Sequence, residues 1–498
     1  MKKITSTITH TKGRNTISLP LAKRLCIAVA LVVVLGSCKK LLDIDPVTSI
    51  AAEKFWKSKN DMKTGMAGVY SSIQTMLSSN YIVWGDLRSD NLDIGGNNNY
   101  KTQCLGALTA TSAGTDWTLV YAAIGNINTA IKYISTIINR DPSISQVEVN
   151  DNLAQLYSLR AYCYFTLIRV WGPVPLWTEP YENINEPPSR ARSSVDSVMN
   201  LIILPDIQRA FPLFDPNKAR MVWYVNSGMT YALLTDVYMW LKKYDKALEA
   251  SNNLIGKYDL LPKDRWKEIF VAPDQDNSNR AENIWSIYWD WTTDKASGLY
   301  NQFSNGSNST SCAMDIDIYN RWVTERYTDI RFALTTDTNS TTRQKQCKFL
   351  PVNLDANKFQ VYPKNGQQNT YYCIYRWADI YLLRAEAFAN LNDFASAGTI
   401  VNAVRVRAGL KPMIFTGTNV SDMLDVILYE RQKELFGESK RWYDLVRNGR
   451  VPEVMNPILM RRGVPGGWGS DLRKILWPIN RTVLNSNKLI TPNQPWSD

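Results

Sequence analysis

The 498-residue chain has 57 basic and 46 acidic residues, a formal net charge of +11, and one histidine. Six of the basic residues, none of the acidic ones and His10 lie in the first 37 residues, so the chain beyond them has 51 basic against 46 acidic residues, a net +5, and no histidine. Without a dense basic cluster a nucleic-acid partner is not expected, and without imidazole a Ser-His-Asp or Cys-His nucleophile and the common zinc sites are excluded.

Residues 1–37 have the pattern of a lipoprotein signal peptide. Lysines and arginines precede an apolar run over residues 25–35, and this run is shorter than the roughly 20 residues that a spanning helix needs. It ends in Leu35-Gly36-Ser37-Cys38, which resembles the lipobox of bacterial lipoproteins. We therefore expect cleavage before Cys38 and acyl chains on its thiol, which anchor the protein to a membrane. The alternative is an ordinary secretory signal with an incidental cysteine.

Five cysteines remain after Cys26 is removed and Cys38 is acylated. They are Cys104, Cys163, Cys312, Cys347 and Cys373. Their number is odd, and they do not form a dense spacing pattern. Cys163 and Cys373 lie in apolar segments, where cysteine is usually a small buried hydrophobe. No disulfide framework is expected.

Helical periodicity dominates the chain. Apolar residues at 3.6-residue spacing predict helices over residues 62–77, 116–138 and 153–171. Ser58 and Asp61 have the spacing of a capping box before the first, Asp116 is placed to cap the second, and Gly172-Pro173 ends the third.

Two later segments, residues 233–254 and 383–404, match at an offset of 150 residues. Each predicts two antiparallel helices, with turns near Lys242-Lys243 and at residues 390–392. This resembles the tetratricopeptide pattern, so we expect a mainly α, helical-repeat scaffold with a few short strands. Long segments rich in Asn, Ser, Gly and Pro interrupt it, at residues 85–115, 173–192, 258–379 and 412–419. Function is expected in these insertions.

The most distinctive insertion is residues 285–291, in which Trp285, Ile287, Trp289 and Trp291 alternate with polar or smaller residues. Alternation predicts a strand with three indoles on one face, beside a polar loop. Indoles stack on the apolar face of a pyranose, so Trp289 and Trp291 are candidate glycan contacts, with Tyr300, Trp322 and Tyr327 as secondary candidates. The alternative is that these tryptophans belong to the core.

Several segments together resemble the SusD/RagB family of Bacteroidetes outer-membrane lipoproteins over nearly the whole chain. They are the stretch CKKLLDIDP from Cys38, Phe55-Trp56, Gly68-Val69-Tyr70, Leu159-Arg160-Ala161-Tyr162, Trp171-Gly172-Pro173, Glu430-Arg431, Glu434-Leu435-Phe436, residues 441–447 and Leu476-Trp477-Pro478-Ile479. The chain departs from the family at Asn480 and at residues 491–496, which belong to a packing tail.

This resemblance implies a SusD-like domain over residues 38–498, with an N-terminal part at about 38–230 and a C-terminal part at about 270–498. It implies a lipid-anchored protein on the outer face of the outer membrane that has no cofactor and catalyses no reaction. Such a protein binds an oligosaccharide, starch-like or other, and passes it to a SusC-like TonB-dependent transporter. The family also suggests Arg88, Asn98 and Tyr100 as ligand contacts. The alternative is a solvated turn in which Arg88 pairs with Asp86 or Asp90.

Charged residues also cluster near the C-terminus, at Glu430, Arg431, Glu434, Arg441, Asp444 and Arg447. Paired catalytic carboxylates are one interpretation, but charges at helical spacing predict a structural ion-pair network.

Three further readings stay open. A RagB-like protein would bind peptide through backbone hydrogen bonds. A glycoside hydrolase would need two carboxylates across a cleft, for which Asp290, Asp315 and Asp317 are candidates. Asp274, Asp276 and Ser278 have the opening spacing of a calcium loop, but Asn279 and Trp285 stand where glycine and glutamate are needed, which rejects an EF-hand and leaves only a looser site.

Overall fold

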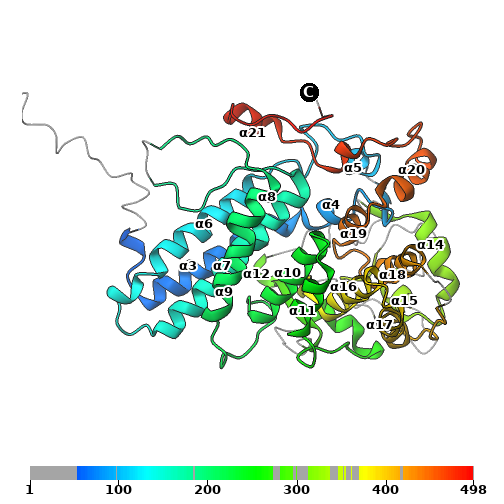
Figure 1. The fold of residues 1–498 in the computed structure, drawn as a ribbon, viewed down its shortest axis with the longest axis horizontal. Coiled ribbons are helices and arrows are strands. Elements are labelled where there is room, and N and C mark those ends of the chain that lie inside the picture. The colour runs from blue at the N-terminus through cyan, green and yellow to red at the C-terminus, as the bar shows by residue number, and fades with distance from the viewer. Residues whose placement is uncertain are drawn as a thin grey trace, which may run out of the picture.

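The computed structural model describes residues 53–96, 98–182, 186–272, 281–294, 299, 312–336, 346–350, 353–354, 360–361, 369–415 and 419–496. Helices dominate these ranges, as predicted, and the strands within them are short (Figure 1). No helix in the described ranges combines the length and apolar character needed to cross a bilayer. The predicted signal peptide and Cys38 lie outside the described residues.

Three long helices form the N-terminal side of the molecule (Figure 1). They are α3 (Lys59–Ser78), α6 (Thr118–Ile134) and α7 (Gln146–Trp171). The capping box predicted before α3 is confirmed, because Ser58 Oγ accepts the N–H of Asp61 and the Asp61 carboxylate accepts the N–H of Ser58. Asp116 accepts the N–H of Thr118 at 2.8 Å.

The predicted ends of α6 and α7 need correction. α6 stops at Ile134, and Ile137 lies in the separate turn η1 (Ile137–Asn139). α7 begins earlier than predicted, at a second capping box formed by Ser145 and Glu148. Its first turns carry mostly polar residues, which hide the helical stripe from the sequence pattern. The helix ends at Gly172, whose φ of +73° closes it just before Pro173.

Shorter helices cover α7 and lead into the repeats. They are α8 (Val195–Val198), η2 (Met199–Ile203), α9 (Leu204–Ala210) and η3 (Phe211–Leu213). α9 is tied to α7 by the buried ion pair of Asp206 with Arg160, at 2.7 Å.

The predicted repeat is confirmed as two helix pairs. The first is α10 (Ser227–Trp240) with α11 (Tyr244–Asn252), and the second is α16 (Trp377–Asn390) with α17 (Phe394–Arg407). The turns match in detail, since Lys242 and Asn392 both have a left-handed backbone, with φ of +56° and +63°. α11 packs on α16, so the two pairs stack as in a helical-repeat protein.

An antiparallel sheet lies against the repeats, with strand order β2 (Val271–Ala272), β7 (Asn369–Arg376), β3 (Asn283–Trp289). β3 and β7 pair from Asn283 opposite Arg376 to Trp289 opposite Thr370, with bulges around Trp285. Two smaller antiparallel pairs join β1 (Leu92–Ile94) to β4 (Cys312–Met314) and β5 (Asn353–Leu354) to β6 (Gln360–Val361).

The other described helices lie between and after these elements in the chain. They are α4 (Tyr81–Gly85), α5 (Lys101–Cys104), η4 (Lys263–Ile269), α12 (Trp291–Asp294), α14 (Ile316–Trp322), η6 (Val323–Glu325), α15 (Ile330–Thr335), α18 (Val420–Glu434), α19 (Arg441–Arg447), α20 (Val451–Arg461), η7 (Leu472–Ile475) and α21 (Arg481–Ser486). The tail behaves as a packing segment, because Asn480 caps α21 and the Asn493 amide donates to the carbonyls of Trp171 and Trp477. All five remaining cysteines are buried.

The charged cluster on α18 and α19 is a buried structural network, as predicted. Arg431 bridges Asp379 and Asp444 at 2.9 and 2.8 Å, and Arg447 pairs with Glu386 at 2.7 Å. Burial opposes ionisation of Glu434, but the guanidinium groups of Arg407, Arg376 and Arg331 hold its pKa well below the ordinary value. These charges join α15, α16, α17, α18, α19 and β7, and their side chains are nearly all removed from solvent.

Candidate functional site

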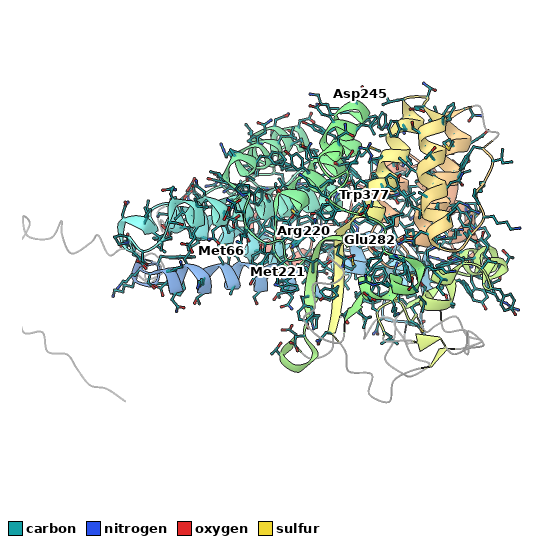
Figure 2. The ribbon with its side chains drawn as sticks, turned by 90° about the horizontal axis from the view of Figure 1, so that it is seen from below. Met66, Arg220, Met221, Asp245, Glu282 and Trp377 are labelled. Carbon is teal, nitrogen blue, oxygen red and sulfur yellow. The ribbon has the colours of Figure 1, made fainter. Side chains whose placement is uncertain are left out.

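A groove of about 950 Å³ lies between the N-terminal helices and β3. Its walls come from α3, the first turns of α7, the connector between η3 and α10, β3 and α12. In Figure 2, Met66 marks the α3 side, and Met221 of the connector lies beside the strands that project from the body. Its volume is at the upper end of the usual range for small-molecule sites, about 300 to 1,000 Å³.

Four aromatic side chains form one wall of the groove. Tyr224 is 45 % exposed, and its ring meets Tyr70 edge to face, with centroids 5.2 Å apart. Trp223 lies against Tyr288 of β3 at 6.1 Å. Aromatic rings held in this way offer flat faces to the CH face of a sugar ring, at little cost in side-chain entropy.

A chain of hydrogen bonds fixes the polar wall. Lys218 Nζ contacts Asp151 at 2.5 Å, and the Gln155 amide donates to the same carboxylate at 2.8 Å. Tyr70 OH donates to Gln155 Oε1 at 2.6 Å and accepts the N–H of Val225 at 2.9 Å. Burial raises the pKa of Tyr70, so the phenol stays protonated. Polar groups held in one geometry can recognise the pattern of hydroxyls on a ligand.

The outer end of the groove is closed by contacts between α3 and the end of β3. Gln74 Nε2 donates to the Tyr288 carbonyl at 3.2 Å and to Asp294 of α12 at 3.1 Å. The N–H of Ser286 donates to the Val222 carbonyl at 2.8 Å. The connector and α3 therefore cover backbone groups on the edge of β3 that faces the groove.

The sequence pattern missed this connector and the two tyrosines on α3 and β3. Trp223 and Tyr224 stand just before α10 in the short apolar run over residues 221–225, and this pair of adjacent aromatics is the signal that the sequence offers. Tyr70 belongs to the apolar stripe of α3, and helical periodicity does not distinguish it from the other residues of that stripe.

The predicted tryptophan strand exists, but it ends at Trp289, and Trp291 begins α12. The prediction that three indoles lie on one face of this strand was therefore wrong. Both faces of β3 are covered: Trp285 is fully buried, and Trp289 is 9 % exposed and stacked on Tyr372 with centroids 5.5 Å apart. The side chain of Trp291 and all of Tyr300 lie outside the described residues.

Arg88 lies in the interior, 1 % exposed. Its guanidinium sits 4.5, 4.9 and 5.3 Å from the ring centroids of Trp442, Trp468 and Trp477. It donates to the carbonyls of Ile475 and Lys474 at 2.9 and 2.5 Å, and burial lowers its pKa to about 9. No face of it is offered to a ligand in this structure. The alternative, in which Arg88 pairs with Asp86 or Asp90, is wrong, because its guanidinium donates to backbone carbonyls instead.

Asp90 pairs with Arg441 at 2.7 Å, whereas Asp86 accepts hydrogen bonds from the N–H of Ser439 and the amide of Asn91, both at 2.8 Å. Asp86 is fully buried, and this burial raises its pKa to about 7.

The raised pKa of Asp86 predicts a pH effect on stability. Between its ordinary pKa and about 7, the folded state holds a proton that the unfolded state has released. The free energy of unfolding should therefore fall as pH rises through this window, by up to roughly 4 kcal/mol for three pKa units. Asp86→Asn should remove that slope. Urea unfolding of both proteins from pH 4 to 8 measures the difference, and parallel profiles would contradict the prediction.

The remaining predicted contacts do not gather at one place. Asn98 is exposed with a left-handed backbone, φ +57°, and Tyr100 is half-buried before α5. Trp322 is fully buried, and its indole N–H donates to Asp329 at 3.0 Å. Tyr327 is 69 % exposed beside Arg326. None of these four side chains lines the groove.

The carboxylates considered for hydrolysis are engaged elsewhere. Asp315 is fully buried and contacts Arg461 and Arg462 at 2.7 and 2.6 Å. Asp317 contacts Arg461 at 3.3 Å, and Asp290 accepts the N–H of Thr293 at the start of α12. Within the described residues no group of three or more His, Cys, Asp or Glu side chains could hold a metal ion, and Asp274, Asp276 and Ser278 lie outside those residues.

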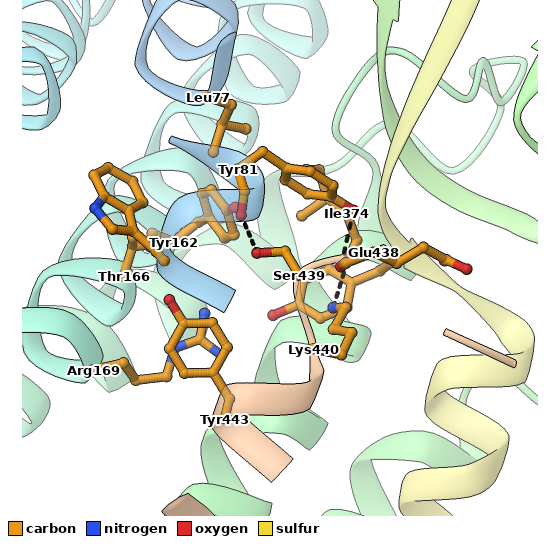
Figure 3. Close-up of a pocket in the computed structure, with 12 residues that line it drawn as sticks. Leu77, Tyr81, Tyr162, Thr166, Arg169, Ile374, Glu438, Ser439, Lys440 and Tyr443 are labelled. Carbon is orange, nitrogen blue, oxygen red and sulfur yellow. Dashed lines mark hydrogen bonds between the residues drawn. The ribbon is translucent and has the colours of Figure 1, made fainter. Parts of the chain in front are cut away.

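A second hollow, of about 30 Å³, lies under α4 between Tyr81, Arg169 and Tyr443 (Figure 3). Lys440 Nζ donates to the Ile374 carbonyl at 2.7 Å on one side of it. This space matches about one water molecule, so it belongs to the polar packing of the interior and cannot hold a sugar ring.

Two family models match the chain in succession. Residues 41–239 match a family described as starch-binding and associating with the outer membrane, and residues 262–496 match the SusD family. The chain belongs to the SusD-like family.

Curated SusD-like relatives align with nearly all of this chain. SusD-like protein P38 of Formosa agariphila is 29 % identical and covers 93 % of this chain and 96 % of its own length. SusD-like protein P2 of the same organism is 26 % identical, covering 94 % of this chain and 98 % of its own length.

Solved SusD superfamily structures share the fold. A protein from Bacteroides vulgatus has a TM-score of 0.72 at 18 % identity, covering 89 % of this chain and 100 % of its own. One from Bacteroides thetaiotaomicron has a TM-score of 0.70 at 22 % identity, covering 89 % of this chain and 99 % of its own. These matches show that the chain has the overall fold of SusD superfamily proteins.

Proposed function

We propose that this SusD-like protein binds an oligosaccharide in the groove between α3, α7 and β3. It does so at the outer face of the outer membrane, anchored through acylated Cys38, and passes the glycan to a SusC-like TonB-dependent transporter. The ligand is bound without covalent chemistry. The family description, starch-binding and associating with the outer membrane, supports the compartment and the class of ligand.

The observation that carries the proposal is the pairing of two walls. Trp223, Tyr224 and Tyr288 present aromatic surface to the groove. The hydrogen-bonded chain of Lys218, Asp151 and Gln155 lines the same groove. A sugar has one apolar CH face and a rim of hydroxyls, so it needs this combination of ring surface and oriented donors and acceptors.

Peptide capture is less well supported by the groove. A bound peptide commonly adds a strand to an exposed sheet edge, where main-chain hydrogen bonds supply affinity. Here the Val222 carbonyl accepts the N–H of Ser286 and Gln74 donates to the Tyr288 carbonyl, so both groups on that edge already have partners.

Changing Tyr224 to Ala should weaken glycan binding by about tenfold or more. Its ring is the most exposed aromatic of the groove wall and makes one edge-to-face contact, with Tyr70. Loss of one stacking face removes roughly 1 to 2 kcal/mol of binding free energy, since aromatic contacts have that magnitude. Calorimetric titration of the soluble form beginning after Cys38 against plant, host and microbial oligosaccharides measures the change.

Tyr327→Ala is the matched control, because Tyr327 is an exposed tyrosine outside the groove. Equal weakening by both changes would place the site elsewhere. Heat from a peptide mixture and none from any glycan would favour the RagB-like alternative.

A further inference from the structure

We propose that the groove selects uncharged glycans and rejects those that carry carboxylates or sulfates. This inference rests on the proposed function and specifies the class of sugar. It follows from the charges along the walls and from the partners that those charges already have.

The described lining is acidic overall. It contains two lysines, Lys63 and Lys218, against four carboxylates, Glu148, Asp151, Asp215 and Asp294. Lys218 is held by Asp151 at 2.5 Å, so its charge is largely compensated within the wall. The same contact compensates Asp151, which leaves Lys63 against Glu148, Asp215 and Asp294, so the described lining is net negative.

One feature of the groove could have attracted an anion. The first turns of α7 line the groove, and the N-terminus of this 26-residue helix carries partial positive charge. Ser145 Oγ, however, accepts the N–H of Glu148, and the Glu148 carboxylate accepts the N–H of Ser145. Glu148 also contacts Lys59 at 2.6 Å, and these bonds lower its pKa. The helix end is thus occupied by the protein's own anion.

An acidic sugar would meet net repulsion, because the single charge of Lys63 does not balance those of Asp215 and Asp294. Two like charges 4 Å apart repel by about 1 kcal/mol in bulk water and by more in a partly enclosed groove. A neutral sugar loses nothing, because hydroxyls can donate to the carboxylates of Asp215 and Asp294. We expect affinities about tenfold lower for a glycan with one uronate at the groove.

The experiment is calorimetry on the soluble protein with matched pairs of probes. The pairs are maltohexaose and its C6-oxidised form, galactan and galacturonan oligomers, and xylan oligomers without and with glucuronate. In whichever pair shows binding, the neutral glycan should bind about tenfold more tightly than its acidic counterpart. The difference should close at about 1 M salt, where the screening length is about 3 Å.

Asp215→Asn tests the cause of the selection. Asn keeps the side-chain acceptor that Asp215 offers to the N–H of Asn217 but removes one negative charge from the groove. The ratio of neutral to acidic affinity should fall severalfold. Asp245→Asn on α11, at the far upper edge in Figure 2, is the control and should leave that ratio unchanged.

The outcomes separate the two proposals. An acidic member that binds as tightly as its neutral partner, or more tightly, overturns the charge selection and leaves glycan binding intact. If no glycan gives a heat of binding, the proposed function is overturned, and the charge selection is overturned with it.

Discussion

Replacing Arg376 with methionine should lower the free energy of unfolding by about 3 to 5 kcal/mol. The Arg376 side chain is 1 % exposed and contacts Glu282, Glu434 and Glu438 at 2.6 to 2.7 Å. Its removal leaves three buried carboxylates with one fewer guanidinium between them, and the low dielectric of the interior makes each uncompensated charge expensive. Methionine retains much of the volume without the charge. Urea unfolding of the soluble form at neutral pH measures the loss.

Arg450→Met is the matched control. Arg450 contacts Asp425 and Glu453, whose side chains are 61 and 62 % exposed, at 3.1 and 2.6 Å. Exposed pairs of this kind contribute about 0 to 1 kcal/mol, so a small change is expected. If Arg376→Met were equally mild, the neighbouring Arg331, Arg407 and Lys348 would be sufficient to hold the carboxylates, and the network would not depend on Arg376.

The helices could be predicted because their determinants are local. The capping box of Ser58 and Asp61 starts α3, and Gly172 with Pro173 ends α7. The repeat could be found because residues 233–254 and 383–404 match at an offset of 150 residues. The structure adds that both turns contain one left-handed residue, Lys242 or Asn392. Such features depend on neighbours within about five residues, and a sequence displays these directly.

The groove could not be predicted in the same way. Tyr70, Asp151, Trp223 and Tyr288 come from four separate segments, and each has an ordinary local explanation as a helix or strand residue. Periodicity says which face of an element is apolar but not what covers that face. For β3 it predicted three indoles on one face, with core tryptophans as the alternative, and packing on both sides buried Trp285 and Trp289.

The charged cluster shows the same division. Charge spacing on α18 and α19 indicated a structural network, which the structure confirms. The partners that complete it, Arg331 and Arg376, come from α15 and β7, and no spacing in the sequence connects them to Glu434.

Arg88→Leu should destabilise the fold by about 3 to 5 kcal/mol and leave glycan affinity unchanged. The guanidinium lies among Trp442, Trp468 and Trp477 and donates to two backbone carbonyls. A desolvated cation–π contact contributes about 2 kcal/mol, and a hydrogen bond from a charged donor about 1.5 to 3 kcal/mol. Urea unfolding measures stability, and titration at a temperature where the variant is folded measures affinity.

This pair of measurements distinguishes two roles for one residue. The family resemblance suggests that Arg88 binds the ligand, whereas the structure surrounds its guanidinium with three indoles. Removing a ligand-binding side chain from the surface would weaken glycan affinity with little effect on unfolding, because an exposed side chain holds no part of the fold together. Loss of stability with intact binding would assign Arg88 to the interior. Weakened binding at wild-type stability would instead mean that the three tryptophans open to admit the glycan, and the site would then lie at Arg88 rather than in the groove.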